Sequence, residues 1–214
     1  MSISDSVKNL LTKVSGALRY KLLSSIKDSN GETVLTRAAF MGQTELCVTL
    51  LSSLPSADRL KLILVNKCTA LHCATFRGYT ETVSGILNCL TADQQLQLLF
   101  TQDSDGDRAL HYAAREGYTD TVKTLLENLT PEQRLQLLFT QDIYGNTALH
   151  YAALRGHAEA VKTLLDNLTP EQQLKLLITQ DSDGDTALHD AARWGHTETV
   201  KTLLDNITPE QQLK

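Results

Sequence analysis

Residues 142–165 read DIYGNTALHYAALRGHAEAVKTLL, and residues 181–204 read DSDGDTALHDAARWGHTETVKTLL. Both stretches have Asp first, Gly fourth, the letters TALH and a closing VKTLL. The histidine of this motif recurs at intervals of 39 residues, at His72, His111, His150 and His189. An earlier copy, GETVLTRAA, has Thr36 in the histidine position, after a shorter interval of 36 residues. A fixed period of this kind indicates a repeat protein whose copies bury their apolar faces against one another.

The copy at residues 142–165 predicts a tight turn followed by two helices. In the turn 142–146, glycine takes the backbone angles that other residues avoid. Thr147 is expected to cap a first helix, which Gly156 ends, because the apolar residues between them follow a 3.6-residue spacing. A second helix carries one apolar stripe, formed by Val161, Leu164, Leu165 and Leu168.

A third helix is predicted at the end of each copy. Residues 130–133 read TPEQ, which places a capping hydroxyl before the helix, a proline at its first position and Gln133 where it completes a capping box. The same letters recur at residues 169–172 and 208–211. The apolar residues that follow, such as Leu135, Leu138 and Phe139, give this helix a single apolar face.

The string D-x-x-G-x-T-A-L-H-x-A-A-x-x-G-H-x-E-x-V-x-x-L-L, present at residues 142–165 and 181–204, resembles the ankyrin repeat. The family unit is about 33 residues long, so the third helix is an addition. Other departures are alanine in place of the usual proline after threonine, Arg108 in place of threonine, and a second copy whose turn lacks Asp and Gly. The resemblance implies an all-α solenoid of antiparallel helix pairs, with hairpin turns that project as fingers.

The repeat limits follow from the recurring letters. Residues 4–27 repeat the apolar spacing of a second and a third helix, so residues 1–27 are expected to form an amino-terminal capping half-repeat. The sequence ends where repeat 5 reaches its third helix, and we expect it to belong to a longer array. The repeats are assigned in order to residues 28–63, 64–102, 103–141, 142–180 and 181–214, the last of them truncated.

Composition excludes several classes of partner. The formal net charge of -5 does not favour nucleic acid. We expect neither membrane insertion nor a signal peptide, because no apolar run is long enough for either. The cytoplasm or the nucleus is the expected location, and a monomer the expected state.

The cysteines support a reduced environment rather than a zinc site. Cys47, Cys68, Cys73 and Cys89 form no CxxC pairs of the kind that structural zinc requires. Cys47 occupies a position that is valine in later copies, including Val161, so it is interpreted as a small buried apolar residue.

Two recurring groups could carry chemistry, and neither is interpreted as doing so. Stacked first helices lie about 8–10 Å apart, which is too far for the motif histidines to share a metal at about 2 Å. In the ankyrin resemblance this histidine instead braces the turns by hydrogen bonds. The acidic stretch DSDGDRALH at residues 103–111 could be a calcium loop, but Arg108 and Ala114 stand where Gly and Glu are needed. We therefore predict no catalytic residue, metal or cofactor.

In the ankyrin resemblance, three turn positions and three positions on the first helix form the concave binding face. Six residues of this set are aromatic, in a chain with only 4 Phe, 6 Tyr and 1 Trp, and such side chains are common anchors of protein interfaces. The predicted partner-binding residues are Arg37, Phe40, Met41, Phe76, Arg77, Tyr112, Arg115, Glu116, Ile143, Tyr144, Tyr151, Leu154, Arg155, Asp190, Arg193 and Trp194.

The charges on the first helices and the fingers suggest the chemical class of the partner. Arginines on the first helices and acidic residues on the fingers (Glu32, Asp105, Asp107, Asp183 and Asp185) favour a protein or peptide with apolar anchors and some acidic groups over a nucleic-acid backbone. Two alternatives stay open. Tyr112, Tyr151 and Trp194 could pack between repeats instead of binding, and the chain could be the regulatory or targeting segment of a larger signalling protein or enzyme.

Overall fold

The computed structural model describes residue 9, residue 11 and residues 13–206. Within this part of the chain, fifteen helices form and no named strand, which confirms the all-α prediction. The chain forms two compact units, residues 1–104 and residues 105–214. Part of the half-repeat (residues 1–8, 10 and 12) and the third helix expected at 208–214 lie outside the described residues.

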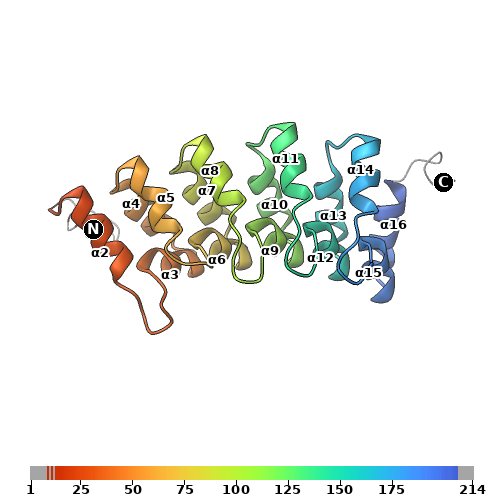
Figure 1. The fold of residues 1–214 in the computed structure, drawn as a ribbon, viewed down its shortest axis with the longest axis horizontal. Helices are drawn as coiled ribbons and strands as arrows, with labels where there is room; N and C mark the ends of the chain where they lie inside the picture. Colours follow the sequence, from red (N-terminus) through yellow and green to blue (C-terminus); the bar gives the residue numbers. More distant parts are fainter. Residues whose placement is uncertain (1–8, 10, 12, 207–214) are drawn as a thin grey trace. The chain divides into compact units, whose positions relative to one another are not determined.

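The first unit holds one leading helix and two three-helix repeats (Figure 1). The leading helix α2 packs against α5, and first helices α3 and α6 and second helices α4 and α7 pair in the same way. Figure 1 shows α3 and α6 on one side of this unit and α5 and α8 on the other. The bounds are α2 (Gly16–Ser25), α3 (Val34–Phe40), α4 (Thr44–Ser52), α5 (Ser56–Ile63), α6 (Ala70–Phe76), α7 (Thr80–Asn88) and α8 (Ala92–Leu99).

The second unit repeats the arrangement. First helices α9, α12 and α15 pack side by side, and second helices α10, α13 and α16 form a parallel row behind them. Third helices α11 and α14 lie on the side opposite the first helices. The bounds are α9 (Ala109–Arg115), α10 (Thr119–Leu126), α11 (Pro131–Leu138), α12 (Ala148–Leu154), α13 (Ala158–Leu165), α14 (Pro170–Leu177), α15 (Ala187–Arg193) and α16 (Thr197–Asp205).

The predicted third helix is present in each of the first four repeats, and its capping box forms in α8, α11 and α14 but not in α5, whose capping residue is Pro55. The backbone N–H of Thr130 donates to Gln133 Oε1 at 3.0 Å, and the N–H of Gln133 donates to Thr130 Oγ1 at 3.2 Å. The residues that start α8 and α14 repeat both bonds. Two N–H groups that a helix start leaves without a partner are thereby satisfied, which offsets the low stability of an eight-residue helix.

The core consists of the apolar stripe of each second helix packed against the alanines of the first helices. Val161 and Leu164 are fully buried, as are Ala152 and Ala153. Cys47 is also fully buried and is a free thiol, which confirms its interpretation as a small apolar residue. The next repeat covers part of each stripe. Truncating a stripe leucine such as Leu164 to alanine is therefore expected to lower the free energy of unfolding by about 2–5 kcal/mol.

Neighbouring fingers are joined by backbone hydrogen bonds in the second unit. The N–H of Ser182 donates to the carbonyl of Tyr144 at 2.9 Å, and the N–H of Ile143 donates to the carbonyl of Asp105 at 3.3 Å. Gly145 has a φ of 80°, and a Cβ on it would lie 2.7 Å from the nitrogen of Ser182. The glycine thus serves both the turn and the close approach of the next finger.

Comparing Gly145→Ala with Gly184→Ala separates the effect of the positive φ in the turn from the effect of the close approach of the next finger. Both glycines have positive φ, but a Cβ on Gly184 meets no atom within 4 Å. Both variants should lose about 1–2 kcal/mol to backbone strain. Gly145→Ala should lose at least about 1 kcal/mol more, because it also disrupts the bond to Ser182. Urea unfolding measures the free energies, and equal losses in the two variants would contradict this role of the finger contact.

Candidate protein-binding surface

Two buried motif histidines, His150 and His111, link the start of a first helix to the next finger or to the residues just before it. In the second unit, His150 Nδ1 accepts hydrogen bonds from the backbone N–H of Thr147 at 3.2 Å and from its hydroxyl at 2.8 Å. The other ring nitrogen, Nε2, donates to the carbonyl of Asp185 at 3.3 Å. His111 does the same, with Nδ1 accepting from the N–H of Arg108 at 2.9 Å and Nε2 donating to the carbonyl of Thr140 at 3.1 Å.

Burial keeps these histidines neutral. His111 is fully buried, and burial lowers its pKa to about 4. Burial also lowers the pKa of His150. Since both ring nitrogens are engaged in hydrogen bonds, neither ring offers a lone pair to a metal or a substrate. No group of three or more possible metal ligands occurs among the residues that the structure describes.

In three fingers, the first aspartate shapes its own turn. Asp142 Oδ1 accepts hydrogen bonds from the N–H groups of Tyr144 and Asn146, both at 2.8 Å. Asp181 and Asp28 make the equivalent pairs of bonds within their turns. These carboxylates are therefore held by backbone donors, as in an Asx turn.

Arginines lie on first helices and acidic residues on the fingers, as the sequence predicts. In three repeats these charges also pair with each other: Glu32 with Arg37 at 3.7 Å, Asp107 with Arg115 at 3.2 Å, and Asp185 with Arg193. Asp107, which we expected on an exposed finger, is buried at 2% exposure. The reason is geometric, since a finger's last residue lies beside the end of the first helix that follows it.

Several predicted binding residues form aromatic and arginine clusters. In the first unit, the guanidinium groups of Arg37 and Arg77 lie over the ring of Phe40, at 5.8 and 5.2 Å from its centroid. In the second unit, Arg115 lies over Tyr112 at 4.5 Å and over Tyr151 at 5.2 Å. Each cluster joins two adjacent repeats, so these arginines contribute cation–π contacts to the frame as well as charge.

Tyr151 packs between repeats, which was the alternative interpretation of this residue. Its hydroxyl donates to Asp142 Oδ2 at 2.6 Å, and its ring meets the ring of His111 edge-on at 6.0 Å. Burial, followed by the bond to Asp142, raises its pKa. Tyr112, Arg115, Glu116 and Leu154 are likewise only partly exposed.

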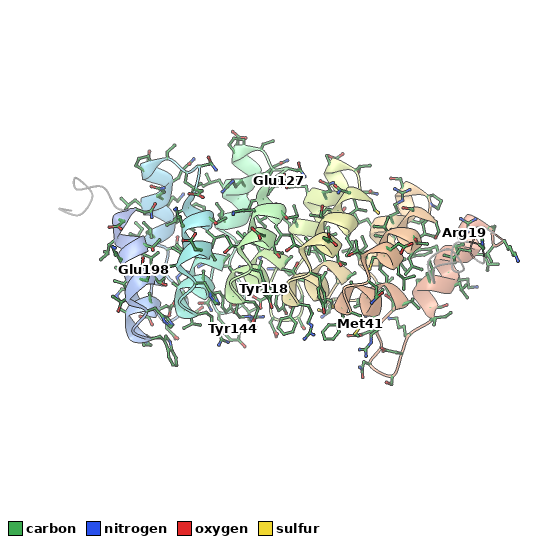
Figure 2. All side chains as sticks on the ribbon, turned by 180° about the vertical axis from the view of Figure 1, so that it is seen from behind. Arg19, Met41, Tyr118, Glu127, Tyr144 and Glu198 are labelled. Atoms are coloured by element: carbon green, nitrogen blue, oxygen red, sulfur yellow. The ribbon has the colours of Figure 1, made fainter. Side chains whose placement is uncertain are left out.

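Five of the predicted residues have large apolar or aromatic side chains that are exposed. In the first unit, Met41 and Phe76 are 53% and 40% exposed, beside the exposed Arg77. In the second unit, Ile143, Tyr144 and Trp194 are 61%, 59% and 63% exposed. Figure 2 shows Tyr144 projecting from its finger on the side of the first helices. Arg155, which directly follows α12, and Arg193, the last residue of α15, are also exposed.

Asp190 differs from the expectation that it is exposed. Its side chain is 5% exposed, and burial, with the charge of Asp181 next, raises its pKa to about 6. The same helix position holds Tyr151 one repeat earlier, where the phenol packs inward. At Tyr151 and Asp190, the tenth-position side chain therefore packs inward, whereas Arg37 at the same position of repeat 1 is exposed.

The sequence model for ankyrin repeats in three copies matches residues 54–136, 87–173 and 133–213. The chain belongs to the ankyrin repeat family. Ankyrin repeats are non-catalytic modules that typically mediate protein–protein interactions. A search of curated proteins gives no match. No helix in the described part of the chain is both long enough and apolar enough to span a membrane.

The sequence did not lead us to predict one set of hydrogen bonds between repeats, made by the histidines that precede the second helices. His157 Nε2 donates to the carbonyl of Arg115, and His196 Nε2 to that of Leu154, both at 3.1 Å. A Cβ on Gly117 would lie 2.5 Å from the His157 ring, which explains why glycine precedes the second helix. The recurring GH letters at 156–157 and 195–196 were the available signal.

The buried His111 predicts acid sensitivity. Its pKa is about 4 in the folded protein and about 6.5 when exposed, so between these values the unfolded chain binds more protons and stability falls as pH falls. The loss between pH 7 and pH 5 should be about 2 kcal/mol. His111→Gln should flatten this slope in urea titrations at several pH values, whereas His189→Gln, at an exposed copy of the motif, should not. Identical slopes for wild type and His111→Gln would contradict the assignment.

Asp190 predicts the opposite dependence. Because its folded-state pKa is about 6 and its ordinary value 3.8, its contribution to stability is full at low pH and is lost as pH rises through 6. Asp190→Asn should therefore raise the free energy of unfolding at pH 7 by about 1–2 kcal/mol, with little gain below pH 4. Asp183→Asn, an exposed neighbour, is the matched control. Destabilisation by Asp190→Asn at pH 7 would show that the carboxylate is instead favourably paired.

Proposed function

We propose that this chain is a non-catalytic scaffold that binds a protein or peptide through the fingers and first helices of its ankyrin repeats. The observation that carries the proposal is the exposure of large apolar side chains at variable repeat positions, while the frame residues around them are buried. Ile143, Tyr144 and Trp194 are each about 60% exposed. Monomeric binding in the cytoplasm or nucleus is part of the same proposal.

The partner chemistry that fits best is apolar. Arginine would ordinarily attract acidic side chains, but Arg37, Arg115 and Arg193 already pair with carboxylates of their own repeats. An acidic partner must compete with these contacts, which lowers the net gain from each new ion pair. Exposed aromatic and aliphatic residues carry no such cost, and Trp and Tyr are the commonest anchors of interfaces.

The partly buried tyrosines have a supporting role in this proposal. Tyr112 and Tyr151 hold Arg115 between them, and Tyr151 is bonded to the finger residue Asp142. They fix the surface before a partner arrives, so little side-chain entropy remains to be lost on binding. The exposed residues, and not these two tyrosines, should dominate the affinity.

The proposal is tested with peptides selected from a display library against the folded protein. Calorimetry then compares wild type with Tyr144→Ala, Trp194→Ala and the double variant. We expect each single change to weaken binding about tenfold or more, because the loss of a central aromatic anchor costs at least about 1–2 kcal/mol.

Ile178→Ala is the matched control, since Ile178 is 60% exposed but follows the third helix α14, away from the first helices. Thermal melts of all variants exclude unfolding as the cause. Undiminished binding by the double variant, or an equal effect of Ile178→Ala, would reject the surface.

A further inference from the structure

Repeat 2 differs from the other repeats at the junction between its turn and its first helix. Cys68 directly precedes Thr69, the capping residue of α6, and Cys73 is the fourth residue of that helix. The two Sγ atoms lie 3.6 Å apart. Repeat 1 has Glu32 and Arg37 at the equivalent positions, paired through their charges at 3.7 Å. A thiol pair thus replaces an ion pair at a junction where side chains from the turn and the helix meet.

The junction is anchored on both sides of Cys68. Asn66 Nδ2 donates to the carbonyl of Gly31 at 3.1 Å, which ties the short turn to the finger of repeat 1. On the other side, the hydroxyl and backbone N–H of Thr69 contact His72 Nδ1 at 2.8 and 3.2 Å. These contacts keep the two thiols near each other, and Cys68 itself lies in the connection rather than in the helix.

The two thiols differ in access. Cys68 is exposed, whereas Cys73 is buried at 6% exposure. An oxidant in solution therefore reaches Cys68 first. The Cys73 thiol lies close enough to react with the oxidised sulfur of Cys68. This combination of an accessible thiol with an adjacent second thiol is the arrangement of a redox-active pair.

We propose that Cys68 and Cys73 form a reversible disulfide when the protein meets hydrogen peroxide. The Cys68 thiolate attacks the peroxide O–O bond, which gives a sulfenic acid on Cys68 and releases hydroxide. The sulfur of Cys73 then attacks the sulfenic sulfur, the S–S bond forms, and water leaves with the Cys73 proton. Two electrons pass from the thiol pair to the peroxide, and a thiol reductant reverses the change.

The environment assigns the two roles. The hydrogen bond with Cys73 lowers the pKa of Cys68, against the opposing effects of partial burial and of the carboxylates Asp103 and Glu32. The same bond, followed by burial, raises the pKa of Cys73. Cys68 is therefore the attacking thiolate, and Cys73 is the resolving thiol. The sulfur atoms have to close from 3.6 Å to about 2.05 Å, and Cys68 lies outside the helix that holds Cys73.

The remaining cysteines provide internal controls. Cys47 is fully buried, and burial raises its pKa to about 12; burial also raises the pKa of Cys89, which is 8% exposed. Neither should react under conditions that oxidise Cys68. The inference does not depend on the proposed binding function, although Cys73 shares α6 with the predicted binding residue Phe76.

The test uses the folded 214-residue chain and hydrogen peroxide. Trypsin cuts after Lys67 and Arg77 and releases CTALHCATFR, which carries both thiols in one peptide. The protein is oxidised, unfolded, alkylated and digested. We expect this peptide to be lighter by two hydrogen atoms and to carry no alkyl group, and a thiol reductant should restore it. The peptides that contain Cys47 and Cys89 should be fully alkylated.

Two variants distinguish the roles of the thiols. In Cys73→Ser, Cys68 should stop at a sulfenic acid that a cyclic diketone traps, because no resolving thiol is present. In Cys68→Ser, Cys73 should remain reduced. The proposal is overturned if the wild-type peptide stays fully alkylated, if wild-type Cys68 accumulates as sulfenic or higher acids with Cys73 reduced, or if Cys47 and Cys89 oxidise first.

Discussion

The hydrogen bonds of the buried motif histidine are the interaction on which the second unit most depends. His150 joins the capping residue of its own helix to the carbonyl of Asp185 in the next finger, and His111 joins its helix to the carbonyl of Thr140. Because both nitrogens of each ring form hydrogen bonds, one side chain connects the start of its own helix to a later segment of the chain. This link holds the finger 181–185 through Asp185, and the chain that leads into the finger 142–146 through Thr140.

That frame determines what is left for a partner. Some finger carboxylates accept hydrogen bonds from backbone N–H groups, as Asp142 does, and others pair with arginines, as Asp107 does. These carboxylates are less available to a ligand. The exposed remainder includes large apolar and aromatic side chains, Tyr144 and Trp194 among them, beside exposed arginines such as Arg155. Under the proposed function, this surface would select a partner by shape and apolar contact while the ankyrin core stays constant.

The sequence was sufficient for the elements but not for the burial of individual side chains. Period, capping boxes and turn glycines are local signals, so the helices, including the third helix, were predictable from letters such as TPEQ. The burial of Asp190 and the pairing of Asp107 with Arg115 were missed, because each depends on side chains from different elements. The contact of Cys68 with Cys73 was missed for a related reason, since it forms only when the turn packs on the helix.

The central claim, that fingers and first helices carry the binding surface, is tested most directly by hydroxyl-radical footprinting of a peptide complex. The method reports the solvent access of single side chains and needs no substitution. Tyr144 and Trp194 should lose reactivity when the peptide is bound, while Ile178 and Leu204, which are also exposed, should keep theirs. Protection of Ile178 and Leu204 with unchanged Tyr144 and Trp194 would contradict the account.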